Sequence, residues 1–172
     1  YLSALGATDA TRGVVIGVLF SVFSLMQFVF SPVWGRISDR IGRRPVLLIS
    51  LLGSVVFYAL YGYSVSLPAS DATLALSLML LSRVGAGIAG ASVGTAAAVI
   101  ADCTPPDKRA KGMALIGIAF GAGFTLGPLI AYFGLAIFAR EPWGVGALAS
   151  ILSLIALLIA VVIFKETRNP EH

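Results

Sequence analysis

The sequence is poor in the residues on which metal binding, disulfide bonding and covalent catalysis depend. Cys103 is the single cysteine and His172 the single histidine among 172 residues. These counts exclude a disulfide framework, a Cys/His metal constellation and a Cys–His nucleophile pair. We therefore expect no metal, no cofactor and no enzyme activity.

Charged residues are also scarce. They make up 12% of the chain, against 58% hydrophobic residues and a mean hydropathy of +0.97. A soluble domain of this length cannot hide so much apolar surface, so the composition indicates an integral membrane protein. The net charge of +4 does not indicate nucleic-acid binding, because the basic residues stand in short segments beside apolar runs.

Several apolar runs are long enough to cross a bilayer core of about 30 Å, which takes a helix of about 20 residues. They lie at about 13–34, 46–66, 74–101, 112–134 and 144–164. The sequence therefore predicts an all-α membrane helix bundle with five spans, forming a single unit over residues 1–172.

Basic residues distinguish the two ends of the predicted bundle. Nine of them stand on one side: Arg36, Arg40, Arg43, Arg44, Lys108, Arg109, Lys111, Lys165 and Arg168. The opposite side holds only Arg12 and Arg140. By the positive-inside rule, the basic side and the C-terminus are cytoplasmic and the N-terminus is outside. The segment before Arg12 lacks the pattern of a signal peptide, so an outside N-terminus predicts a further helix before Tyr1.

Small residues form stripes along the third and fourth spans. Gly87 and Gly90 belong to the third, and Gly117, Gly121, Gly123 and Gly127 to the fourth. Such stripes allow helices to approach closely in a membrane. Pro128 follows the last of these glycines, and its missing N–H and its ring predict a bent or weakened helix there.

Two polar residues inside the spans are candidates for substrate binding or coupling. Arg83 is the only charged residue well inside a span, so it should face a cavity or a partner. The alternative is a position near the outer end of its helix, from which the side chain reaches the interface. Gln27 either donates hydrogen bonds to a ligand or bonds a neighbouring helix, and both alternatives stay open.

The segment 35–45 is strongly charged and reads GRISDRIGRRP between two apolar runs. We expect a hinge on the basic side. Asp102 lies on the same side, at the end of the third span, and is placed to complete a charge network with Arg43 or Arg44. The alternative is a set of ordinary topology charges at a water interface, where ion pairs contribute little.

These motifs together resemble the major facilitator superfamily. The gating motif of that family, in its loop between the second and third helices, is matched by Gly35, Asp39, Arg40, Gly42, Arg43 and Arg44. Arg83 with Gly87 and Gly90 resembles the arginine–glycine motif of the fourth helix. Gly123, Gly127 and Pro128 resemble the antiporter motif of the fifth, although Ala131 and Tyr132 replace its final glycines and Ala114 an earlier one. The tail Phe164–Arg168 is similar to tetracycline-efflux-like members.

The resemblance implies one six-helix half of a secondary transporter, the N-terminal half without its first helix. Its partners would be the lipid bilayer, a small organic substrate, the first helix and a C-terminal half. In such a transporter Asp39 would lock the cytoplasmic side against the other half, supported by Arg43 and Asp102. Efflux across a bacterial inner membrane is the expected function, and uptake is an alternative.

Proton coupling is a further expectation, but none of the eight acidic residues lies at mid-membrane depth. A coupling carboxylate would therefore lie outside the 172 residues. The alternative to transport is a half-length membrane subunit with a structural role in a larger membrane complex.

Overall fold

A computed structural model describes residue 6 and residues 8–166, and in this part of the chain all regular structure is helical. The α-helices are α1 (Asp9–Ile41), α2 (Arg43–Ser66), α3 (Ala72–Gly90), α4 (Val93–Cys103), α5 (Arg109–Ile137) and α6 (Trp143–Ile163). Two short 3-10 helices, η1 (Ala69–Asp71) and η2 (Pro106–Lys108), precede α3 and α5. Within the described residues, five helical stretches are long and apolar enough to cross a membrane. The predicted all-α membrane bundle with five spans is confirmed.

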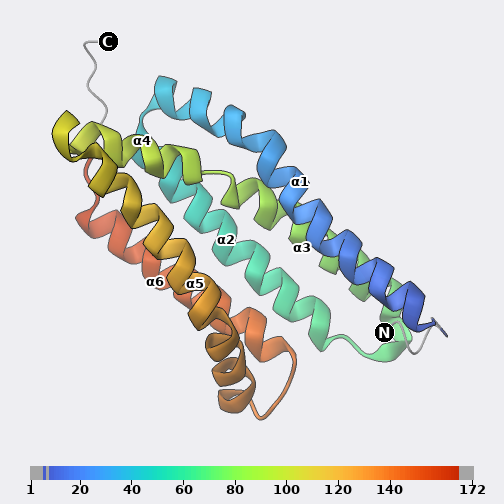
Figure 1. Cartoon of the computed structure of the whole chain (residues 1–172). Helices are drawn as coiled ribbons and strands as arrows, with labels where there is room; N and C mark the ends of the chain where they lie inside the picture. Colours follow the sequence, from blue (N-terminus) through green and yellow to red (C-terminus); the bar gives the residue numbers. More distant parts are fainter. Residues whose placement is uncertain (1–5, 7, 167–172) are drawn as a thin grey trace.

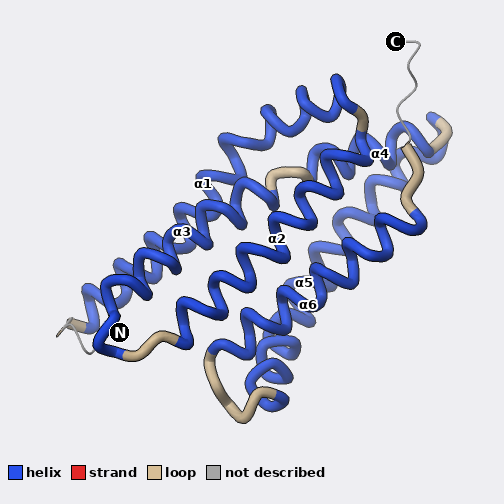
Figure 2. The backbone as a smooth tube through the Cα atoms, turned by 180° about the vertical axis from the view of Figure 1, so that it is seen from behind, coloured by secondary structure: helices blue, strands red, loops and turns tan. Residues whose placement is uncertain are grey.

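Helix α2 runs through the middle of the bundle. Figures 1 and 2 show α1 and α3 on one side of it and α5 and α6 on the other. The segments 36–44, 102–111 and 164–166 gather at one end of the bundle, which we call the basic end (Figure 1). The cytoplasmic location of the basic end stays a prediction. Thr167 and Arg168, which belong to the predicted tail motif, lie outside the described residues.

Glycines allow the helices to touch through their backbones. A Cβ atom added to Gly146 of α6 would lie 2.6 Å from the amide nitrogen of Gly62 on α2, and one added to Gly87 would overlap the backbone of Phe23 on α1. Apolar helices gain little by associating in lipid, so contacts of this kind supply the dispersion energy that holds the bundle together. The predicted stripe of the third span therefore serves helix packing at Gly87.

The charged segment 35–45 differs from the predicted hinge. Residues 35–41 are the last turns of α1, and Gly42 alone separates α1 from α2. Gly42 has a φ of +106°, a conformation that side-chain-bearing residues rarely adopt, so a glycine makes this one-residue junction possible. The side chains of the segment consequently follow helical spacing.

The third span also differs from its prediction as one run over 74–101. It is interrupted at residues 91–92, between α3 and α4. In contrast, α5 continues through Pro128 to Ile137, and Figure 1 shows its last turns angled away from the rest of the helix. The proline thus bends α5 without ending it, as a residue that removes one helical hydrogen bond can do.

Candidate functional site

Opposite charges meet at the basic end around the guanidinium group of Arg43. Its Nη1 donates to Asp39 Oδ1 at 2.5 Å and to Ser38 Oγ at 2.8 Å. Its Nε donates to Asp102 Oδ2 at 3.3 Å. The Arg43 side chain is 16% exposed and that of Asp39 is 62% exposed. One arginine therefore joins α1, α2 and α4, while the Asp39 carboxylate keeps an open side.

Backbone geometry sets the spacing within this cluster. Asp39 lies in the last turn of α1 and Arg43 is the first residue of α2. Between them the N–H of Gly42 donates to the carbonyl of Ser38 at 3.1 Å. The contacts of Arg43 with Asp39 and Asp102 therefore fix the ends of α1, α2 and α4 relative to one another.

Glu166 approaches the same cluster from the segment after α6. Its Oε1 accepts the backbone N–H of Arg43 at 2.9 Å, and its Oε2 accepts that of Arg44 at 3.0 Å. Glu166 belongs to the predicted tail motif, but its contact with this cluster was not predicted from the sequence. The available signal was an acidic residue directly after the last span, on the side where the basic residues gather.

The other residues of the predicted gating motif lie outside the contacts of Arg43 with Asp39 and Asp102. Arg44 Nη2 donates to the carbonyl of Val161 on α6 at 2.9 Å. The carbonyl of Gly35 accepts the Ser38 hydroxyl at 2.8 Å, and Arg40 is exposed. The structure thus brings Asp39, Arg43 and Asp102 together and ties Arg44 to α6.

The break in the third span is held by side chains of neighbouring helices. The last carbonyl groups of a helix have no partner within that helix, and an unpaired carbonyl is costly inside a membrane. Three side chains donate to these carbonyls: Trp34 Nε1 to Ile88 at 2.6 Å, Ser50 Oγ to Ala89 at 2.5 Å and Gln27 Nε2 to Gly90 at 3.0 Å. The amide of Gln27, a predicted substrate or coupling candidate, is therefore engaged with the backbone of α3.

Arg83 lies on α3, half-buried, with its guanidinium carbon 4.2 Å from the centre of the Tyr61 ring on α2. A cation above an aromatic face is attracted by the ring quadrupole. None of the salt bridges among the described residues includes Arg83. The structure thus gives the predicted coupling candidate an aromatic neighbour within the bundle.

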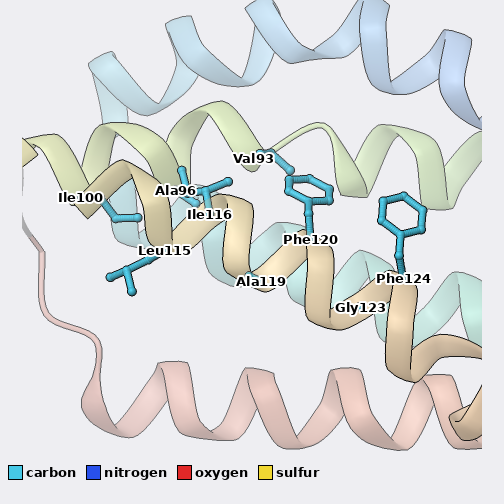
Figure 3. A pocket seen from close by; sticks show the side chains of 9 residues that line it. All are labelled: Val93, Ala96, Ile100, Leu115, Ile116, Ala119, Phe120, Gly123 and Phe124. Atoms are coloured by element: carbon cyan, nitrogen blue, oxygen red, sulfur yellow. The ribbon is translucent and has the colours of Figure 1, made fainter. Parts of the chain in front are cut away.

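An apolar groove of about 580 Å³ runs between α4 and α5. Its lining includes Val93 and Ile100 on α4 and Phe120, Gly123 and Phe124 on α5, and no charged side chain. Figure 3 shows the rings of Phe120 and Phe124 on the same face of α5, pointing away from α6. We call this feature the α4–α5 groove.

The glycine stripe of α5 has no neighbour within the described part of the chain. A Cβ atom added to Gly117, Gly121, Gly123 or Gly127 would meet no atom within 4 Å there. By contrast, a Cβ atom on Gly90 would lie 3.3 Å from Gln27 Nε2. The two predicted glycine motifs therefore differ: that of α3 packs closely inside the bundle, and the glycines of α5 make no close contact with another described helix, with Gly123 lining the α4–α5 groove.

Comparisons with known proteins place these features in context. The model of the Major Facilitator Superfamily matches residues 2–172. The class B tetracycline resistance protein of Escherichia coli is 39% identical over 153 residues, which cover 89% of this chain and 35% of the relative. Major facilitator superfamily domain-containing protein 10 of Bos taurus is 40% identical over 155 residues, covering 90% of this chain and 31% of the relative.

A solved structure resembles the fold over nearly the whole chain. The crystal structure of the human organic anion transporter MFSD10 (TETRAN) superposes with a TM-score of 0.73 at 33% sequence identity. The match covers 99% of this chain and 37% of the human protein. The chain thus spans about a third of the length of the relatives that it matches.

Proposed function

The chain belongs to the Major Facilitator Superfamily, and we propose that it forms part of a secondary transporter that exports a small amphipathic organic molecule. In this proposal the chain works with helices that it does not itself contain. Two observations support this: the relatives are about three times as long, and the α5 glycine stripe has no neighbour among the described residues.

The observation that carries the proposal is the charge cluster in which Arg43 bridges Asp39 and Asp102. Alternating access requires a contact that closes one side of the transporter and opens again in each cycle. Asp39 is held by Arg43 on one side and is open on the other. An open carboxylate is suited to the positive N-terminal end of a helix in a second bundle, where helix dipoles favour anions. Asp39 would then be the reversible lock at the cytoplasmic side.

The α4–α5 groove supports an organic substrate with an apolar, aromatic part. Its volume of about 580 Å³ falls in the range of small-molecule sites, which are mostly apolar with few polar groups. Relatives named for tetracycline resistance make tetracycline the first compound to test. Proton coupling is part of the proposal, with the coupling carboxylate outside these 172 residues. The expected location is the inner membrane of a bacterium.

The test is transport by the full-length protein in everted membrane vesicles, with tetracycline as probe and with or without a pH gradient. We expect gradient-dependent accumulation, and Asp39→Asn should lower its rate by at least tenfold because the neutral side chain binds a helix N-terminus more weakly. Asp107→Asn is the matched control, since it removes an exposed carboxylate at the same end of the bundle.

Wild-type vesicles that accumulate none of a panel of amphipathic drugs would favour the structural-subunit alternative. Transport by the Asp39→Asn variant at the rate of the parent would refute the role of Asp39 as the reversible lock.

A further inference from the structure

We infer that Glu166 is a positioning residue of the gate, one that fixes the start of α2 so that Arg43 can hold Asp39 and Asp102. The inference rests on the proposed function, because the gate has a role only in a transporter. The Glu166 carboxylate accepts the backbone N–H groups of Arg43 and Arg44, so it acts on the gate through the start of α2.

Helix α2 begins without a side-chain cap of its own. Helices expose free N–H groups in their first turn, which a side chain at the N-cap position usually accepts. The N-cap of α2 is Gly42, which has no side chain. The Glu166 carboxylate, 123 residues after Arg43 in the sequence, caps the helix instead: one of its oxygens accepts the N–H of Arg43 and the other accepts the N–H of Arg44.

Gly42 and the Glu166 carboxylate lie close together. A Cβ atom at position 42 would lie 2.5 Å from Glu166 Oε2, so the end of the Glu166 side chain would have to move. A glycine at position 42 therefore permits both the positive φ of the junction and the close approach of this carboxylate. The Glu166 carboxylate thus occupies the space that the missing side chain of Gly42 leaves open.

The contact of Glu166 with α2 reaches the charge cluster through Arg43. Glu166 holds the main chain of Arg43, and the guanidinium group of the same residue reaches Asp39 on α1 and Asp102 on α4. Arg44 adds a second link to the same helix end through the carbonyl of Val161. A displacement of the α6 end is therefore transmitted to the guanidinium group of Arg43. The segment that follows α6 is mechanically connected to the gate.

The test uses the accessibility of a thiol beside Arg43, which requires no substrate. Ser38 is fully buried and accepts a hydrogen bond from Arg43, so Ser38→Cys in a full-length background with other cysteines replaced reports on this contact. Everted vesicles are treated with a membrane-impermeant maleimide. Glu166→Gln should raise the alkylation rate about tenfold, since one charge-assisted cap is weakened. Gly42→Ala, which displaces the carboxylate and also strains the positive-φ junction, should act in the same direction.

Glu141→Gln makes the same chemical change in an exposed residue at the opposite end of the bundle and should leave the alkylation rate unchanged. Equal rates for Glu166→Gln and its parent would overturn the inference. In tetracycline transport, Glu166→Gln should lower Vmax and leave KM unchanged, and it should add little to the loss caused by Asp39→Asn. Additive losses would also overturn it. A parent protein that transports nothing refutes the proposed function, while the alkylation result still decides the role of Glu166.

Discussion

Replacing Gln27 by leucine is expected to destabilise the break in the third span by about 1–2 kcal/mol. The Gln27 amide donates to the carbonyl of Gly90 at 3.0 Å, and leucine leaves that carbonyl without this donor. Interhelical hydrogen bonds in membranes contribute about 0.6 kcal/mol on average, and an unsatisfied buried polar group costs about 1–3 kcal/mol. The expected value lies between these limits because Gly90 is only half-buried.

Two measurements check this value in the purified full-length protein. Unfolding in mixed detergent micelles should show the loss of stability. Amide hydrogen exchange at residues 91–95 should become about tenfold faster, because 1.4 kcal/mol of local stability corresponds to a factor of ten. Ser77→Ala is the control, since its hydroxyl donates to the carbonyl of Thr73 within the same helix and not across the break.

The competing interpretation gives a different result. If Gln27 binds the substrate, Gln27→Leu raises KM for transport while stability and exchange stay at the level of the parent. That combination would refute the role of Gln27 in holding the break. Ser50→Ala, which removes the donor to the carbonyl of Ala89, offers a further comparison. If both side chains hold one break, the stability lost in the double variant should differ from the sum of the two single losses.

Three further predictions concern helix contacts and backbone strain. Gly146→Ala should lower the stability by about 2 kcal/mol or more through overpacking against α2, whereas Gly13→Ala, whose methyl group meets open space among the described residues, should not destabilise; a thermal unfolding series compares them. Ala139→Gly should raise the stability by about 0.5–1 kcal/mol by relieving a φ of +54°. Ala136→Gly, inside helix α5, should lower the stability by about 1 kcal/mol. Stability changes of the same sign in the two variants would contradict this prediction. Tyr61→Leu should cost about 0.5–2 kcal/mol by removing the ring below the guanidinium group, and Tyr61→Phe, which keeps the ring, should be nearly neutral in the same assay.

The spans were predictable because each is a long apolar run, and a membrane leaves a helix as the simplest way to satisfy the backbone. The break after Gly90 was not predictable in the same way. Its local sequence, GASVG, contains no proline, and the side chains that stabilise it stand on α1 and α2. A break that depends on donors from other helices leaves no periodic signal in its own segment.

The candidate site was predictable in part for a similar reason. Asp39 and Arg43 are four residues apart, so a helical spacing places them together, and Asp102 stands at the matching end of its span. Glu166 meets Arg43 only because α6 packs along α2. This packing depends on the close backbone contact between Gly62 and Gly146, which the sequence near Glu166 does not indicate. The one-residue junction at Gly42 was missed because the charges of 35–41 resemble those of a loop.

The residues of the cluster around Arg43 are synthesised at different times. Asp39 comes first, four residues before Arg43, so this pair can form as soon as the facing ends of α1 and α2 are present. Asp102 follows 59 residues after Arg43, and Glu166 arrives 123 residues after it. Until that last carboxylate is in place, the start of α2 lacks its cap. The arrival of Glu166 therefore completes the capping of α2, and a chain that ends before this residue leaves the N–H groups of Arg43 and Arg44 without this carboxylate.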